Sequence, residues 1–430
     1  MIKAMKAFDK FYKKTLEERR AVLAEYADLN EEEQAFLAST GALSLDKANH
    51  MIENTVGIYS LPLGLGMNML LNEKNYIVPM AMEEPSVVAA QSSGAKLIAQ
   101  NGGMKGSATD RKMIGQIELI NVRDVQSAEE DVVANREKII AIANDAHPSL
   151  QKRGGGAVDL QVRNAKTASE ETLFIVHLLV DTQEAMGANM VNTMVETLAP
   201  ELELLTGGTA NMRILSNLVD EATATVTCRL SPLSLATKTQ SGEWVRDRII
   251  AAYEFADADI YRAATHNKGI MNGIDAVIMA FGNDWRAVEA ASHAYAARTG
   301  SYKPMSKWSK DAEGYLVGEL TLPMPVAFVG GSIGIHPIAT LSKKIARVES
   351  AKELAMLVCA VGLTQNLSAL KALVTEGIQR GHMSLQAKSL AMTAGAEADE
   401  IEKVATFLQE SKQLNIVAAK EFIIKLRSGK

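Results

Sequence analysis

Between residues 110 and 220 the chain alternates strand-like and helix-like stretches in an order that few folds accommodate. Apolar runs, a charged helical stretch, a triple-glycine turn and a second helix follow one another, at residues 113–122, 128–147, 154–156, 157–164, 171–181 and 184–199. This order is typical of a ferredoxin-like split βαβ unit. The chain contains no G-x-G-x-x-G, so a Rossmann-type doubly wound sheet is not indicated.

A chain of 430 residues is too long for one simple core, so we expect several domains. The expected fold class is α+β: a large, mostly helical domain interrupted by the ferredoxin-like α/β unit and followed by a mobile C-terminal helical flap. The expected boundaries are 1–109 and 221–375 for the large domain, 110–220 for the small domain and 376–430 for the flap. Residues 1–40 alternate charged and apolar residues at helical spacing, which predicts one or two helices that pack on the body or on a partner.

Composition excludes several classes of protein. The net charge is −6 without a basic block, which argues against a nucleic-acid partner. No apolar run reaches the roughly 20 residues that span a bilayer, and the charged start lacks the apolar core of a signal peptide, so we expect a cytoplasmic protein. Cys228 and Cys359 form no metal-binding pattern, and we expect no metal.

The densest group of polar residues lies in residues 262–290 and surrounds the apolar run 276–281. Its members are Arg262, His266, Asn267, Lys268, Asn272, Asp275, Asn283 and Asp284. Gly269, Gly273 and Gly282 predict tight turns, so we expect a loop here. A single lysine among amides, glycines and apolar residues is suited to act as a fixed cation.

Glu83 and Glu84 leave a predicted strand just before Pro85 and an apolar helix. They can complement the dipole of that helix. Alternatively, one of them can be buried in a site, where burial and the neighbouring carboxylate would raise its pKa. Asp284 also has two compatible interpretations, as the N-cap of the next helix and as a catalytic carboxylate. His50, His177, His293 and His336 are expected to be structural.

A second candidate site lies where the apolar run 171–181 gives way to a helix that we expect to start near Glu184. The small residues Gly187 and Ala188 leave the first turn open, so a diphosphate could reach its free N–H groups. Many helices begin with small residues, and the motif by itself does not decide between a phosphate site and an ordinary helix start.

Several segments in order resemble the 3-hydroxy-3-methylglutaryl-coenzyme A (HMG-CoA) reductase family, most closely its soluble bacterial class II. They are IENTVG, MEEPSVVAA, EAMGAN, ILSN, THNKGIMNGID, GNDWRAVEA, LPMPV and EGIQRGHMSLQ, and they cover roughly residues 40–395. The resemblance implies an NAD(P)H-dependent, four-electron reduction of HMG-CoA to mevalonate and free coenzyme A, in the isoprenoid pathway.

The resemblance also implies roles for individual residues. The implied catalytic residues are Glu84, Lys268, Asp284 and His382. The implied substrate-binding residues are Ser86, Arg262 and Asn272. The implied cofactor-binding residues are Glu184, Met186, Gly187, Ala188, Asn189, Asn217 and His147. Glu184 departs from the family's Asp, and Ile333 stands where relatives often have Thr.

His147 occupies the place where NAD-using relatives have an acidic residue, and Lys152 and Arg153 follow it. Basic groups favour the 2′-phosphate of NADP, so we expect NADPH to be preferred over NADH. The family implies a homodimer, or a higher even oligomer, with the active site between subunits, and glycines around His382 imply a hinge at Gly381 that moves the flap. The rival interpretations are a non-catalytic acyl-CoA or nucleotide sensor and a dehydrogenase for another small alcohol or aldehyde.

Overall fold

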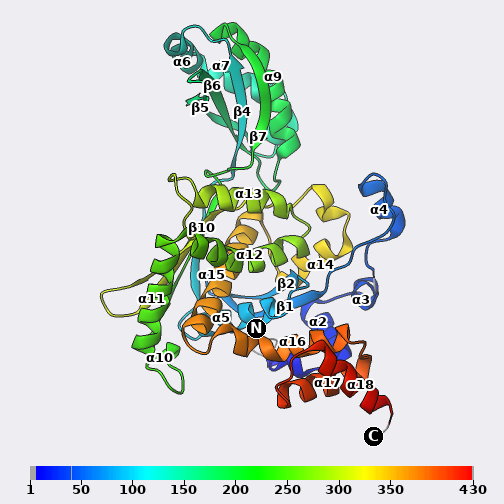
Figure 1. Ribbon diagram of the computed structural model, residues 1–430. Coiled ribbons are helices and arrows are strands. Elements are labelled where there is room, and N and C mark those ends of the chain that lie inside the picture. The colour runs from blue at the N-terminus through cyan, green and yellow to red at the C-terminus, as the bar shows by residue number, and fades with distance from the viewer. Residues whose placement is uncertain (1–5, 40, 429–430) are drawn as a thin grey trace.

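The computed structural model describes residues 6–39 and 41–428, and it describes the backbone but not the side chains of residues 378–385 and Ala398. Two sheets with separate cores organise the chain (Figure 1). A six-stranded sheet lies in the central body, a four-stranded sheet forms the upper part in Figure 1, and three C-terminal helices project from the opposite end. The fold is a mixture of helices and strands, as expected.

The N-terminal helices pack on the body through a small apolar cluster. Each of the first two long helices starts with a capping box, from Thr15 and from Asn30. Leu23 packs in one cluster with Ile77 of the central sheet and Ile345 of a later helix. The elements are η1 (Phe11–Lys13), α2 (Leu16–Ala27), α3 (Glu31–Ala38) and α4 (Leu45–Met51).

The central sheet has the strand order β2-β1-β3-β8-β10-β9, antiparallel except where β1 meets β3. Its strands are β1 (Leu63–Leu71), β2 (Lys74–Ala81), β3 (Met104–Ala108), β8 (Thr223–Leu230), β9 (Ser306–Lys310) and β10 (Leu316–Pro323). Its helices are α5 (Val87–Ala99), α10 (Pro232–Leu235), α11 (Gly242–Ala258), α12 (Ile260–Ala280), α13 (Trp285–Ala296), η2 (Gly331–Gly334), α14 (Pro337–Ala346) and α15 (Ala351–Val374). Helical residues outnumber strand residues in the large domain, as expected.

Helix α15 is the central core helix of the body. It is long and apolar enough to cross a membrane, but 67% of its most apolar window is buried inside the protein. Gly273 and Gly362 allow α12 and α15 to approach closely, because a Cβ at Gly273 would lie 3.0 Å from Val361 Cγ1. An apolar helix in this position is what the core of a folded domain requires.

The four-stranded sheet has the antiparallel order β5-β6-β4-β7. Its elements are β4 (Lys112–Ile120), α6 (Val125–Ala134), α7 (Arg136–Asp145), α8 (Pro148–Gln151), β5 (Gly156–Lys166), β6 (Thr172–Asp181), α9 (Ala188–Thr206) and β7 (Thr209–Ser216). In chain order this is strand, helices, two strands, helix and strand, which is the ferredoxin-like arrangement. Its apolar core is separate from that of the body.

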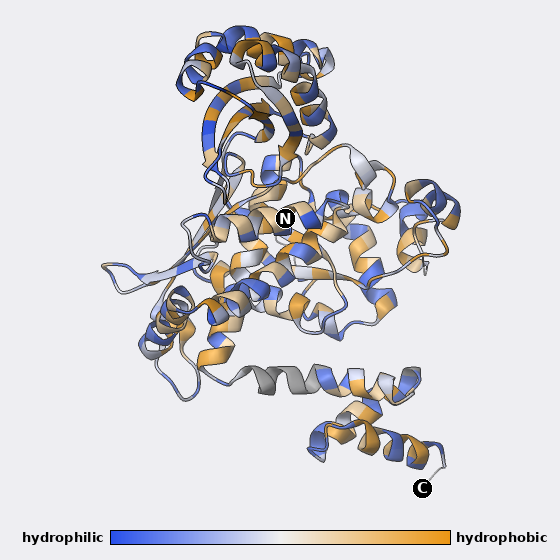
Figure 2. Ribbon diagram, turned by 45° about the horizontal axis from the view of Figure 1, so that its top comes forward, coloured by the Kyte–Doolittle hydropathy of each residue, from blue (hydrophilic) through white to orange (hydrophobic). Residues whose placement is uncertain are grey.

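The C-terminal segment forms α16 (Ile378–Thr393), α17 (Ala398–Glu410) and α18 (Ile416–Arg427), which pack around Val404 and Leu408. Figures 1 and 2 show these helices standing apart from the body. The break after α15 lies at Gly377, whose φ is +79°. Gly381 lies within α16, so the prediction of a hinge at that residue is wrong.

The predicted loop over residues 262–290 is also wrong. Residues 260–280 form one continuous helix, α12, which begins when Asp259 caps the N–H of Arg262 at 2.7 Å. Buried residues recur along it at helical spacing, among them Ala263, Ile270, Ile274 and Val277. Burial of this face overrides the low helix propensity of its glycines and asparagines.

Candidate active site

Lys268 and Glu84 meet although 184 residues separate them in sequence. Lys268 lies in the middle of α12, and Glu84 lies in the short connection between β2 and α5. The Lys268 Nζ donates a hydrogen bond to Glu84 Oε2 at 2.9 Å. The two side chains are 62% and 40% exposed, so this ion pair faces solvent in the single chain. A cation and a carboxylate are thus held together where a ligand can reach both.

The predicted substrate-binding residues lie around this pair. Ser86 is two residues after Glu84 and adopts a φ of +79° as it starts α5. Asn272 is half-buried one turn after Lys268 on α12. Arg262 is half-buried near the start of the same helix, and burial lowers its pKa. Two segments therefore position these residues: the β2–α5 connection and one length of α12.

Asp284 does not join the pair in this chain. Its carboxylate caps α13 by accepting from the N–H groups of Arg286 and Ala287, each at 3.1 Å, and Arg286 also forms an ion pair with it at 3.2 Å. The N-cap interpretation of Asp284 is therefore correct. Among the described residues, Asp284 forms no hydrogen bond or ion pair with Lys268 or Glu84.

The turn before Asp284 is firmly bonded to the body. Gly282 has a φ of +65°, which favours glycine. Ser332 Oγ donates to the carbonyl of Gly282 at 2.9 Å, and Asn283 Nδ2 donates to the carbonyl of Ala327 at 3.0 Å. The backbone N–H of Ala327 donates back to Asn283 Oδ1. These bonds fix the position from which α13 starts.

The first turn of α9 is open, as a diphosphate site requires. The helix starts at Ala188 rather than at Glu184, and Gly187 precedes it with a φ of +88°. A Cβ at Gly187 would lie 2.3 Å from Thr182 Cγ2, so only glycine fits. Helix N-termini offer free N–H groups and a favourable dipole to phosphates. The half-buried Met186 and exposed Asn189 flank this turn.

The other predicted cofactor residues lie near the same corner. Gln183 Nε2 donates to the carbonyl of Gly154 at 3.3 Å, which places the triple-glycine turn beside the start of α9. His147 precedes the short helix α8 that leads into that turn. Asn217 follows β7, and Leu215 at the end of β7 donates to Asn192 of α9. The corner therefore gathers residues from three separate stretches of chain.

The carboxylate of Glu184 bonds to the body of the protein. Its carboxylate accepts a hydrogen bond from the N–H of Ala351 at 2.7 Å, at the first residue of α15. Its carbonyl accepts from Phe328 and Val329. The buried Arg111 donates to the carbonyls of Gln183, Ala185 and Val326 alongside it. This stretch joins the four-stranded unit to the body.

His382 is the last of the predicted catalytic residues. Its backbone lies in α16, and its side chain is outside the described part of the structure. The four histidines that we expected to be structural, His50, His177, His293 and His336, have hydrogen-bond partners or are partly buried. Among them, His336 accepts the N–H of Ile338 at 3.2 Å.

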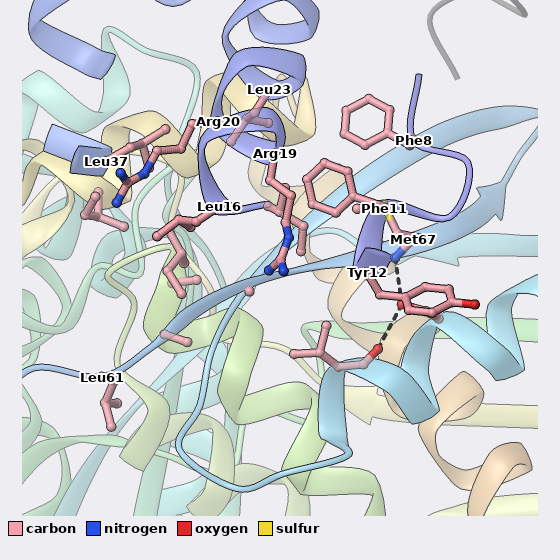
Figure 3. A pocket seen from close by; sticks show the side chains of 18 of the residues that line it. Phe8, Phe11, Tyr12, Leu16, Arg19, Arg20, Leu23, Leu37, Leu61 and Met67 are labelled. Atoms are coloured by element: carbon pink, nitrogen blue, oxygen red, sulfur yellow. Dashed lines mark hydrogen bonds between the residues drawn. The ribbon is translucent and has the colours of Figure 1, made fainter. Parts of the chain in front are cut away.

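A large cavity, which includes Ser86 in its lining, was not predicted from the sequence (Figure 3). It has a volume of about 1620 Å³ and reaches from Ser86 and Ala81 to the N-terminal helices. Its wall combines the aromatic rings of Phe11 and Tyr12 with cationic side chains, including those of Arg19, Arg20 and Lys96. The only sequence signal for it was the alternation of charged and apolar residues in the first 40 positions.

No group of three or more His, Cys, Asp or Glu side chains is placed to hold a metal ion within the residues that the structure describes.

Comparison with known proteins identifies the family. The family model for hydroxymethylglutaryl-coenzyme A reductase matches residues 15–387. The chain belongs to the HMG-CoA reductase family. An HMG-CoA reductase of Archaeoglobus fulgidus is 45% identical over 418 residues, which are 97% of this chain and 94% of that protein. A probable HMG-CoA reductase of Borreliella burgdorferi is 35% identical over 79% of this chain and 77% of its own length.

Solved structures agree with this membership. The class II HMG-CoA reductase of Streptococcus pneumoniae, bound to NADPH in open conformations, superimposes with a TM-score of 0.82 at 46% identity. The match covers 96% of this chain and all of that one. A second structure from the same organism gives a TM-score of 0.84. The resemblance to the HMG-CoA reductase family is therefore confirmed.

Proposed function

We propose that this chain reduces HMG-CoA to mevalonate and free coenzyme A with two molecules of NADPH. The observation that carries the proposal is the Lys268–Glu84 pair, a cation and a carboxyl group 2.9 Å apart, in a chain of this family. Reduction of a thioester to an alcohol needs positive charge and a proton at the carbonyl oxygen, and this pair supplies both.

The chain's own residues would act as follows. When bound, NADPH supplies a hydride to the carbonyl carbon in each of two steps. The ammonium of Lys268 stabilises the negative charge that develops on the carbonyl oxygen. In its protonated form, Glu84 donates the proton which that oxygen takes up. We assign to His382 the protonation of the coenzyme A thiolate after the carbon–sulfur bond breaks.

The cavity in Figure 3 is our candidate for the coenzyme A portion of the substrate. Its lining includes Ser86, two residues from the acid that we propose to be catalytic. Its lining also includes Arg19 and Arg20 on α2, and guanidinium groups bind phosphates strongly. We propose that Arg262, Ser86 and Asn272 bind the carboxylate and hydroxyl of the HMG group.

We propose that the cofactor binds at the corner formed by residues 186–189, Asn217 and His147, on residues 110–220 acting as a separate domain. The bare start of α9 fits a diphosphate, since glycine is required at position 187 by both its φ and the proximity of Thr182. His147 would stand near the 2′-phosphate. Glu184 is not part of this proposal, because its carboxylate bonds to α15.

We further propose a cytoplasmic homodimer in which Asp284 reaches the Lys268–Glu84 pair of the partner subunit. In the single chain Asp284 pairs with Arg286 instead. The segment before β1 also exposes large apolar side chains, with Ile52, Val56 and Tyr59 at 63%, 101% and 88% exposure. Exposed apolar surface of this kind is typical of an interface between subunits.

The assay that tests the reaction follows the loss of NADPH absorbance with HMG-CoA, and mevalonate is identified as product. Acyl-CoA or nucleotide binding without turnover would favour the sensor interpretation. Turnover only with another alcohol or aldehyde would favour a different dehydrogenase.

A mixed dimer tests the shared site. Lys268→Ala and Asp284→Ala subunits, each inactive alone, are unfolded and refolded together. A site built from two chains leaves one intact site in each heterodimer, so about a quarter of wild-type activity returns. No recovery, or an active monomer in sedimentation, would contradict the shared site.

A further inference from the structure

Two polar residues of α12 that directly precede Lys268 are buried and have no part in the proposed reaction. His266 is 1% exposed and Asn267 is 0% exposed. Lys268 lies on the opposite, exposed face of the helix, together with Ala264 and Thr265. Successive residues of an α-helix are about 100° apart around its axis. Whatever holds His266 and Asn267 therefore also sets the direction in which the side chain of Lys268 leaves the helix.

Asn267 is bonded to the backbone of the segment that leads into β9. Its Nδ2 donates to the carbonyl of Lys303 at 2.9 Å, and its Oδ1 accepts the N–H of Met305 at 2.8 Å. Both polar atoms of the amide are therefore used. Hydrogen bonds have a preferred distance and angle, so they fix the rotation of a helix more closely than apolar packing does.

His266 is bonded to side chains from β9 and α15. Its Nε2 lies 2.7 Å from Ser306 Oγ and 3.2 Å from Asn366 Nδ2. Ser306 Oγ and Trp308 Nε1 both donate to Asn366 Oδ1, at 2.8 and 2.7 Å. All four side chains are buried. One network of hydrogen bonds thus joins α12, β9 and α15 directly behind the turn that carries Lys268.

Only one nitrogen of the His266 ring takes part in this network. His266 Nδ1 is buried and has no hydrogen-bond partner among the described residues. Burial, and then the charge of Arg262, lowers the pKa of His266 to about 3, so the ring is neutral. A buried polar atom without a partner lowers stability, and an apolar ring in the same place would avoid that cost. The bond at Nε2 is therefore the feature that distinguishes histidine from an apolar residue here.

The segment that receives these bonds is itself fixed to two further helices. The hydroxyl of Tyr302 lies 2.8 Å from His293 Nδ1 on α13. Lys303 Nζ donates to the carbonyl of Asp257 on α11 at 2.7 Å. His266 and Asn267 therefore connect α12 to a part of the body that is held from several sides.

We propose that His266 and Asn267 are positioning residues that set the rotation of α12 and so hold the Lys268 ammonium at Glu84 and the substrate carbonyl. The 2.9 Å hydrogen bond between Lys268 and Glu84 forms within one chain, so this role needs no second subunit. The inference rests on the proposed function of Lys268. A displacement of a catalytic group by about 1 Å can lower a rate by about 10²-fold.

Four variants separate the hydrogen bonds from the volume that they occupy. His266→Phe keeps a ring and removes both nitrogens. His266→Gln can place an amide where Nε2 lies, whereas His266→Asn reaches only the place of the unused Nδ1. Asn267→Leu removes both bonds of the amide at similar volume.

His177→Phe is the matched control. His177 is also a buried histidine, and its Nε2 lies 2.8 Å from Gln116 Nε2 in the four-stranded sheet. The control therefore also removes a buried hydrogen bond of an imidazole, but far along the chain from α12. Thermal melts show whether the two histidine variants lose similar stability.

The experiment measures kcat and the KM for HMG-CoA. In His266→Phe, His266→Asn and Asn267→Leu, kcat falls more than about fivefold, and in His266→Gln and His177→Phe it falls less than that. KM changes less than about threefold throughout, because Arg262 is fixed separately by the cap from Asp259. A smaller fall of kcat in the first group, or an equal fall in His266→Gln or His177→Phe, overturns the proposal.

Amide hydrogen exchange tests the same role without activity. Exchange of residues 264–272 is slow in the wild type, in His266→Gln and in His177→Phe, and at least about tenfold faster in His266→Phe, because the polar contacts that hold this turn are gone. If His266→Phe does not fold, Ser306→Ala replaces it and removes one partner of Nε2. Unchanged kcat and unchanged exchange in that variant overturn the proposal.

The two tests fail separately. A wild type that does not turn over HMG-CoA, but whose exchange responds as expected, would contradict the proposed function of Lys268 and not the bonds that hold α12. An active wild type whose kcat survives His266→Phe would contradict the positioning role alone.

Discussion

Helix α12 carries two ionic pairs that differ in almost every physical respect. Lys268 and Glu84 form an exposed pair of opposite charge, whereas Asp275 and Glu289 are half-buried like acids, and burial and Glu289 raise the pKa of Asp275. An exposed pair contributes roughly 0–1 kcal/mol to the free energy of unfolding. A buried polar group that loses its partner costs about 1–3 kcal/mol. Helix α12 thus carries Lys268, which a ligand can reach, and Asp275, which is expected to affect mainly the stability of the fold.

The largest expected effect is on turnover after Lys268→Ala. Removal of the cation should lower kcat by about 10³-fold, because the charge on the carbonyl oxygen is no longer stabilised. Tm should change by less than about 2 °C, since the lost pair is exposed. Initial rates with NADPH and a thermal melt measure both. Retained activity above about a tenth would contradict the assigned role.

A smaller loss of turnover is expected for Glu84→Gln. The amide can still accept a hydrogen bond from Lys268 but has no acidic proton to donate, so kcat should fall about 10²-fold. Binding of HMG-CoA, measured by calorimetry, should change by less than about threefold. Turnover at the wild-type rate would show that another group supplies the proton.

The variant Glu289→Ala should lower the stability of the fold rather than the rate of the reaction. The change removes the neighbour of the half-buried Asp275 and the carboxylate that pairs with His293 Nε2, so the free energy of unfolding should fall by about 1 kcal/mol. Glu254→Ala, at an exposed position on α11, is the matched control and should change it by less than about 0.5 kcal/mol. Urea unfolding measures both. Equal losses of unfolding free energy in the two variants would show that Glu289 contributes no more to stability than an exposed glutamate.

Sequence reasoning found the class of fold because strand and helix periods between residues 110 and 220 are clear. It was wrong about residues 262–290 because glycine and asparagine suggested a loop. The apolar positions 263, 270, 274 and 277 already had helical spacing, and giving that spacing more weight than composition would have predicted α12.

The sequence identified candidate site residues but not the side chains that contact them. Family resemblance identified Glu84 and Lys268, and the structure brings them into contact. No local pattern could show that Asp275 lies near Glu289, because their proximity depends on how two helices pack. The same holds for the cavity, whose wall combines residues from the first 23 positions with β1 and α5.

The carboxylate of Glu184 adds a mechanical coupling to the molecule. The family motif has Asp at this position, and the extra methylene of Glu extends the reach of the carboxylate, which here bonds to the first residue of α15. A rotation of the four-stranded unit that moved Glu184 would pull on the longest helix of the body. Any motion of that unit relative to the body must therefore either break this hydrogen bond or move the start of α15 with it.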